Sequence, residues 1–173
     1  MIRILKQIFR TGIVNEPVPI VTDPEIEKLG VQLEETIRKR FRRSLTIRQV
    51  DAGSCNGCEL EIHAMNNVFY NCEKYGIHFT ASPRFADLLL VTGPVTHNME
   101  IALKRTYDAT PTPRIVVAVG DCGRNGGVFG EGYASLGGID KVIPVDAVIP
   151  GCPPTPHDLL QGLLTAIRNS PRA

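Results

Sequence analysis

From residue 44 onward, short apolar runs alternate with longer segments of helical periodicity, and this alternation restricts the possible folds more than any other feature. Five apolar runs predict strands, namely Leu45–Val50, Ile77–Thr80, Leu88–Val91, Ile115–Val119 and Val142–Val145. Helices are expected over 58–72, 96–107 and 155–167, the last with Thr155 as its N-cap. Continuous Val, Ile and Leu runs separated by helices are typical of a parallel sheet covered on both faces. We therefore expect a flavodoxin-like α/β fold with a mostly parallel sheet.

The first part of the chain has a different pattern. Residues 12–24 contain three prolines and are expected to form an extended connector, which ends in a capping box at Thr22–Glu25. The next segment carries apolar residues at intervals of three and four, which predicts a helix with one apolar stripe, formed by Ile26, Leu29, Leu33, Ile37 and Phe41. We therefore expect an N-terminal extension of amphipathic and basic helices over 1–43, and an α/β domain over 44–173.

Cysteines occur in three loops that follow predicted strands, over 51–58, 120–127 and 146–154. The carboxyl ends of parallel strands meet at one edge of a sheet, where α/β proteins bind their ligands. The order of the elements therefore predicts that four cysteines gather at that edge, namely Cys55, Cys58, Cys122 and Cys152.

The cysteine pair at Cys55 and Cys58 is a CxxC motif, which fits a redox pair, a zinc half-site or an iron–sulfur half-site. A redox pair leaves Cys122 and Cys152 unexplained, and zinc sites usually bring a second CxxC. Four thiolates from three glycine-rich loops suit a [4Fe–4S] cluster, which takes one thiolate per iron. The alternative is that these cysteines pack as small hydrophobic residues. Cys72, late in a predicted helix, is expected to be a core or boundary residue.

Other polar residues near the cysteines have two interpretations each. Glu59 and Glu61 suit a solvated helix N-terminus, or they form a polar link or proton relay, for which Glu61 is slightly favoured. His157 follows the last cysteine loop and is able to tune a cluster through a hydrogen bond. Asp121 is expected to close its own loop through an Asx-type bond. The sequence contains no catalytic triad and no P-loop, and we assign no catalytic residue.

Charge is distributed unevenly along the chain. Residues 1–50 hold ten Lys/Arg and six Asp/Glu, whereas 51–173 hold nine and twelve. The excess lies in Arg38, Lys39, Arg40, Arg42, Arg43 and Arg48. This run is typical of a solvated helix C-terminus, and the alternative is an anionic partner. No nucleic acid is expected as a partner, because aromatic residues make up only 6% and none lies among these arginines.

The N-terminal segment Met1–Arg10 mixes cationic with apolar residues and lacks the unbroken apolar region of a signal peptide. It fits a short interfacial helix, or alternatively a frayed terminus. No apolar run in the sequence is long enough to span a bilayer, so we expect a cytoplasmic protein.

Five motifs resemble the small subunit of membrane-bound energy-converting [NiFe] hydrogenases, a family homologous to the 20 kDa subunit of respiratory complex I. They are Asp51–Glu61, Ser82–Arg84, Val91–Thr96, Gly120–Cys122 and Pro150–Pro154. The resemblance covers 44–168, and Ile4–Pro19 is similar to the formate hydrogenlyase and hydrogenase-4 branch. Complex I subunits of this family carry two adjacent cysteines in the first loop, whereas Cys55 and Cys58 have the hydrogenase spacing. Arg84 matches a family motif near a subunit junction.

The resemblance implies that Cys55, Cys58, Cys122 and Cys152 ligate one [4Fe–4S] cluster. The chain would then relay electrons between a Ni–Fe large subunit and a ferredoxin-like polyferredoxin subunit. The complex would also contain membrane-embedded antiporter-like subunits, and this chain would lie peripherally on the cytoplasmic side of the membrane. Residues 1–20 are expected to dock on those membrane subunits. One alternative is a related quinone or sulfur reductase without nickel, and another is a stand-alone iron–sulfur or zinc scaffold.

Overall fold

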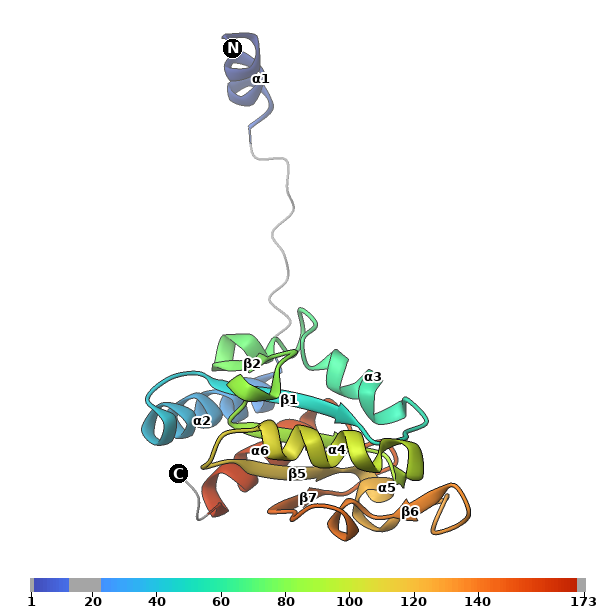
Figure 1. Ribbon diagram of the computed structural model, residues 1–173. Coiled ribbons are helices and arrows are strands. Elements are labelled where there is room, and N and C mark those ends of the chain that lie inside the picture. Colours follow the sequence, from blue (N-terminus) through green and yellow to red (C-terminus); the bar gives the residue numbers. More distant parts are fainter. Residues whose placement is uncertain (1, 13–22, 171–173) are drawn as a thin grey trace.

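A computed structural model describes residues 2–12 and 23–170 of the chain (Figure 1). Its centre is a five-stranded sheet with the order β2-β1-β3-β5-β7, in which every neighbouring pair is parallel. The strands are β1 (Leu45–Asp51), β2 (Ile77–Phe79), β3 (Leu88–Thr92), β5 (Ile115–Val119) and β7 (Ala147–Ile149). Two short strands, β4 (Val95–Thr96) and β6 (Ser135–Gly137), form a separate antiparallel pair. Counting only the central strands, the order is 2-1-3-4-5, which confirms the flavodoxin-like prediction.

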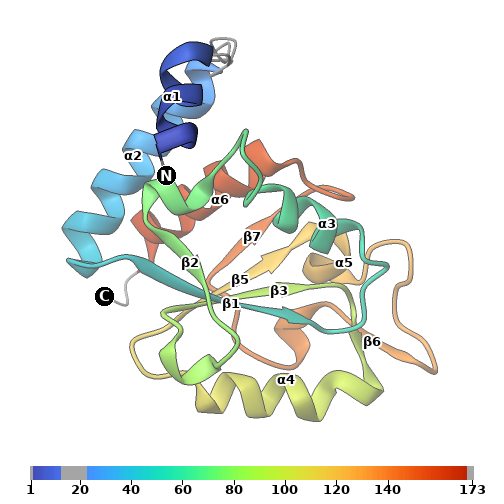
Figure 2. The ribbon, with the colours of Figure 1, turned by 90° about the horizontal axis from the view of Figure 1, so that it is seen from above.

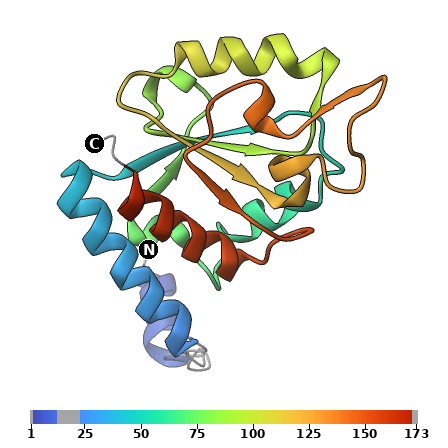
Figure 3. The ribbon, with the colours of Figure 1, turned by 90° about the horizontal axis from the view of Figure 1, so that it is seen from below.

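Helices cover both faces of this sheet, as Figure 2 and Figure 3 show. One face carries α4 (His97–Ala109), and the other carries α2 (Pro24–Phe41), α3 (Gly57–Ala64) and α6 (Pro156–Asn169). Successive strand residues serve opposite cores, so that Leu88 and Leu90 pack with α2 and α6 while Leu89 and Val91 pack with α4. This double burial explains the uninterrupted apolar runs in the sequence.

The remaining helices are short. They are α1 (Ile2–Thr11), α5 (Gly120–Asn125) and three 3-10 helices over Cys72–Tyr75, Pro83–Phe85 and Ile139–Lys141. None of the residues of α1 is buried. No helix among the residues that the structure describes is long and apolar enough to cross a membrane.

The predicted stripe of α2 is confirmed. Four of its residues are buried and Phe41 is partly buried against the same core, the four being Ile26, Leu29, Leu33 and Ile37. Asp23 is the N-cap, and its side chain accepts a hydrogen bond from the Glu25 N–H at 2.9 Å. Thr22, the first residue of the predicted capping box, lies outside the described residues. Thr155 caps α6 as predicted, in a capping box with Asp158.

Two predicted elements are wrong in extent or place. The helix expected over 58–72 ends at Ala64, because Asn67 Oδ1 accepts hydrogen bonds from the next backbone N–H groups, those of Phe69 and Tyr70, and so forms a turn. Cys72 consequently opens a 3-10 helix instead of lying late in an α-helix, although it is buried as expected. The last strand is 147–149 rather than 142–145, where Pro144 lacks a backbone N–H for the ladder.

The basic cluster divides between three positions. Arg38, Lys39 and Arg40 occupy the last turn of α2, as expected for a helix C-terminus. Arg40 also donates to the carbonyls of Ile167 and Ser170 at the end of α6. Arg43 forms an ion pair of 2.6 Å with Asp87, and Arg48 belongs to β1. Two of these six cations, Arg40 and Arg43, therefore join the C-terminal end of α2 to other parts of the fold.

Candidate functional site

The three cysteine loops lie at the carboxyl edge of the sheet, toward which the arrowheads of β1, β3 and β5 point in Figure 2. The first loop follows β1 and is folded back by Asp51, whose Oδ1 accepts hydrogen bonds from the Gly53 and Ser54 N–H groups at 2.7 and 2.8 Å. Cys55 stands in this loop and Cys58 in the first turn of α3. The turn between them places Asn56 in the left-handed region at φ 70°.

The second and third loops are joined directly to each other. The Asp121 N–H donates to the Gly151 carbonyl at 2.9 Å, and the Gly151 N–H donates to Asp121 Oδ1 at 3.2 Å. The expectation that Asp121 closes its own loop is therefore wrong, because its side chain reaches across to the loop that precedes Cys152. This pair of hydrogen bonds holds Cys122 and Cys152 on neighbouring segments.

Glycines provide the space around two of the sulfurs. A Cβ on Gly120 would lie 2.9 Å from Cys58 Sγ, and a Cβ on Gly127 would lie 2.8 Å from Cys122 Sγ. Both glycines have positive φ, at 78° and 50°, which other residues rarely adopt. Because these two glycines have no side chain, their backbone lies close to the two sulfurs. A side chain at either position would fill the space beside the cysteine.

The four thiols influence one another electrostatically. Burial, and after it the Glu59 carboxylate and the other three cysteines, raises the pKa of Cys58 to about 12. Burial and then Cys152 raise the pKa of Cys122, while the Val128 backbone N–H acts in the opposite direction. Neighbouring thiolates disfavour each other's ionisation, and bound metal cations stabilise thiolates in their ionised form.

These residues fit an iron–sulfur cluster by their chemistry and by their surroundings. Thiolates are the ligands of such clusters, and here they stand on loops whose glycines leave room beside the sulfurs. Cys58 and Cys122 are buried, whereas Cys55 and Cys152 are exposed. Over residues 2–12 and 23–170, no group of three or more His, Cys, Asp or Glu side chains is arranged to hold a metal ion.

Two other candidates differ from the sequence interpretation. Glu59 is only 6% exposed, and neither of its carboxylate oxygens has a hydrogen-bond partner among the described residues, so it is not part of a solvated helix end. Sequence reasoning favoured Glu61, which is half-buried. The sequence feature that could have indicated the burial of Glu59 is its position directly after Cys58, in the first turn of α3.

Arg84 and Cys72 lie away from the cysteine edge. Arg84 is exposed in the 3-10 helix that precedes β3, at the opposite, amino end of the strands. Cys72 packs in the core and donates its thiol hydrogen to Asn66. His157 is half-buried in the first turn of α6, close in sequence to Cys152.

The fold of this chain is similar to that of a chain in a solved hydrogenase. A chain of the [NiFeSe] hydrogenase of Desulfovibrio vulgaris Hildenborough superposes with a TM-score of 0.52 at 19% identity, over 71% of this chain and 59% of that one, which shows the fold alone. Residues 55–166 match the family described as the 20 kDa subunit of NADH ubiquinone oxidoreductase. The chain belongs to this family, whose members are oxidoreductase subunits that bind an iron–sulfur cluster.

Relatives of known name come from several complexes. The chain is 42% identical to formate hydrogenlyase subunit 7 of Escherichia coli over 87% of its own length, and it spans 58% of the length of that relative. It is 45% identical to the probable membrane-bound hydrogenase subunit mbhJ of Pyrococcus furiosus, over 75% of this chain and 77% of the relative. A chain in the archaeal membrane-bound sulfane sulfur reductase superposes with a TM-score of 0.65 at 35% identity, over 81% of this chain and 77% of that one.

Proposed function

We propose that this chain is the electron-transfer subunit of a membrane-associated [NiFe] hydrogenase complex. Cys55, Cys58, Cys122 and Cys152 would hold one [4Fe–4S] cluster, which when bound carries single electrons. The observation that supports this most strongly is the position of four cysteines in three segments at one sheet edge, with glycine backbone against two of the sulfurs.

The protein around these cysteines has two tasks in this proposal. The hydrogen bonds between Asp121 and Gly151 keep two of the loops at a fixed separation, so that the ligands are preorganised. Burial of Cys58 and Cys122 keeps water from one side of the site, which together with nearby N–H groups sets a reduction potential.

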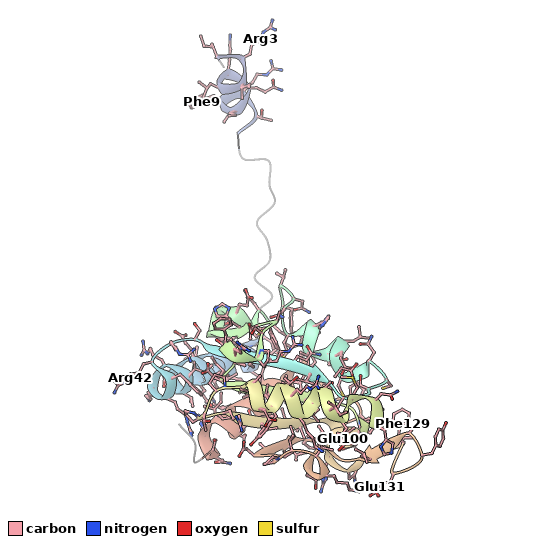
Figure 4. The ribbon with its side chains drawn as sticks, viewed as in Figure 1. Arg3, Phe9, Arg42, Glu100, Phe129 and Glu131 are labelled. Carbon is pink, nitrogen blue, oxygen red and sulfur yellow. The ribbon has the colours of Figure 1, made fainter. Side chains whose placement is uncertain are left out.

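A large subunit with a Ni–Fe centre is the partner that we propose for the cysteine edge. Exposed apolar side chains lie on α3 and on the segment between α5 and β6, namely Leu60, Val128, Phe129 and Tyr133. Figure 4 shows Phe129 on the segment between α5 and β6, at the end of the molecule that carries the cysteines. A patch of this kind indicates a surface that another protein covers. The second electron partner would be a ferredoxin-like polyferredoxin subunit.

Attachment to the cytoplasmic side of the membrane is the second part of the proposal. The apolar side chains of α1 are exposed, among them Ile2 at 83% and Phe9 at 87%, and the cations Arg3, Lys6 and Arg10 share its other side. Figure 4 shows Arg3 and Phe9 on different sides of this helix. An amphipathic helix without acidic residues suits an interfacial position. We propose that it docks on membrane-embedded, antiporter-like subunits.

A complex without nickel is a second candidate, because the sulfane sulfur reductase chain is 35% identical to this one. In that case the partner would reduce a sulfur compound or a quinone. A stand-alone iron–sulfur or zinc scaffold is the third, and it leaves the apolar cysteine edge without a partner.

The experiment is affinity purification of the tagged chain from its native host under anaerobic conditions. We expect a visible absorption that dithionite bleaches, together with a co-purified large subunit that contains nickel. A large subunit without nickel would support the reductase and contradict the hydrogenase. A colourless chain that contains zinc, or a coloured chain that purifies alone, would contradict the proposal.

A further inference from the structure

A cavity of about 480 Å³ lies beside the first cysteine loop, between β1, α3 and the segment after β2. Its polar lining includes Arg48 and Asp51 from β1, His63 from α3, and Asn66 and Thr80. None of these residues is among the four cysteines, so the cavity is distinct from the proposed cluster site and its inference stands without it.

The cavity exists because β2 is shorter than β1. In the described pairing, β2 meets β1 only from Leu45 to Ile47, and the last hydrogen bond runs from the Thr80 N–H to the Ile47 carbonyl at 2.9 Å. Beyond that point, the registered pairs of β1 are with β3 alone. The edge of β1 over 48–51 is therefore not paired with β2 and lies beside the cavity.

Three acceptor atoms of the lining already accept hydrogen bonds within the protein. Asp51 Oδ1 accepts from the Gly53 and Ser54 N–H groups. Asn66 Oδ1 accepts from Cys72 Sγ at 2.8 Å, and burial raises the pKa of Cys72 to about 11, so that the thiol keeps its hydrogen at neutral pH. Thr80 Oγ1 accepts from the Ser82 N–H at 3.3 Å.

In contrast, donor groups of the lining have no acceptor in the described residues. Arg48 Nε is fully buried and has no hydrogen-bond partner in the described residues. Because its oxygen is occupied, Asn66 presents its amide N–H groups, and Thr80 retains its hydroxyl hydrogen. A buried N–H without an acceptor destabilises a protein, and the terminal N–H groups of the same guanidinium are the donors that an occupant with acceptor atoms is able to reach.

We propose that this cavity binds an oxyanion, a carboxylate or phosphate-type group, with Arg48 as its principal contact. A guanidinium presents a planar fork of N–H donors that matches such groups, and Asn66 and Thr80 add neutral donors. The group belongs either to a free small molecule or to an acidic side chain of a partner subunit. The Asp51 carboxylate in the same lining repels anions. The occupant is therefore expected to contact Arg48 and not Asp51.

The test is a titration of the full-length ¹⁵N-labelled chain with inorganic phosphate and with succinate, against chloride at equal ionic strength. The Arg48 Nε–H resonance reports on the site directly. We expect a saturable shift with phosphate or succinate, a loss of at least roughly tenfold in affinity in Arg48→Gln and in Arg48→Lys, and unchanged affinity in Arg105→Gln, an exposed control on α4. The backbone amide spectrum of each variant verifies its fold.

The same titration on the assembled complex distinguishes a free small molecule from an acidic side chain of a partner subunit. A free ligand predicts that the complex still binds the anion, whereas a partner carboxylate predicts that assembly blocks the anion and that Arg48→Gln weakens assembly. The proposal is overturned if neither anion gives a saturable shift and Arg48→Gln leaves assembly unchanged. It is also overturned if chloride shifts the Arg48 resonance as much as phosphate and succinate do.

Discussion

Cys58 Sγ lies against Gly120, 2.9 Å from the position that a Cβ would occupy on that glycine. Gly120 is the first residue after β5, and Cys58 stands in the first turn of α3, so this contact brings two of the three cysteine loops together. A Cβ at this position would also approach the Gly151 carbonyl at 3.2 Å, on the third loop. All three loops therefore meet around one residue without a side chain.

Replacing Gly120 should disturb the cysteine site more than the fold. In Gly120→Ala the new methyl group collides with Cys58 Sγ, and its φ of 78° is unfavourable for alanine. We expect iron content to fall to half or less of the wild-type value, measured by iron analysis after anaerobic reconstitution. Gly132→Ala is the matched control, because nothing lies within 4 Å of its Cβ position, and equal iron loss in both variants would refute the steric explanation.

Gly30 should be intolerant of alanine although it lies within a helix. Its missing Cβ leaves space for the ring of Tyr75, which would lie 2.1 Å from that Cβ and is held by a hydrogen bond from its hydroxyl to Glu27. We expect Gly30→Ala to destabilise the chain by roughly 1–2 kcal/mol, because overpacking outweighs the gain in helix propensity. Val31→Ala, at an exposed neighbour, should change the unfolding free energy little, and a stabilised Gly30→Ala would contradict this packing.

The layers of the fold follow from the sequence where side-chain burial determines structure. The runs around Leu88 and Ile115 are buried on both faces, and the stripe of α2 is buried on one, so their periodicity was sufficient to predict them. Prediction was wrong where short polar side chains bind the backbone. Asn67 ends α3 by accepting hydrogen bonds from two N–H groups, and Val68, directly after it, is 98% exposed.

The cysteine edge was predictable because the order of parallel strands places their carboxyl ends together. The finer arrangement depends on contacts between loops that are far apart in sequence. The bond between Asp121 and Gly151 spans 30 positions, and the burial of Glu59 depends on how α3 packs at the edge. A sequence pattern carries no information on either contact, so both were missed.

A charged residue on the apolar rim should weaken the complex. Val128 is 88% exposed and follows Gly127 directly, beside the loop of Cys122. We expect Val128→Asp to reduce the co-purified large subunit at least about fivefold, because a carboxylate would be desolvated in the interface. Ile101→Asp changes a residue of similar type on α4, 61% exposed, and should have no effect. Full retention of the large subunit by Val128→Asp would assign the interface to another surface.

Deletion of residues 1–20 should separate the soluble module from the membrane. None of the residues of α1 is buried, so its loss removes no core contact. We expect the truncated chain to keep its iron and its large subunit while the module moves to the soluble fraction on sedimentation. A truncated complex that still sediments fully with membranes, in both low and high salt, would show that this segment is not the anchor.

The ligand assignment is tested most directly by iron analysis and electron paramagnetic resonance on five single Cys→Ala variants of the purified complex. We predict that replacing Cys55, Cys58, Cys122 or Cys152 removes or converts the [4Fe–4S] signal, because one iron loses its thiolate. Cys72→Ala should retain the iron content and the signals of the wild-type complex, because Cys72 is buried in the core and hydrogen-bonded to Asn66. Loss of the cluster in Cys72→Ala together with an intact cluster in Cys152→Ala would contradict the account.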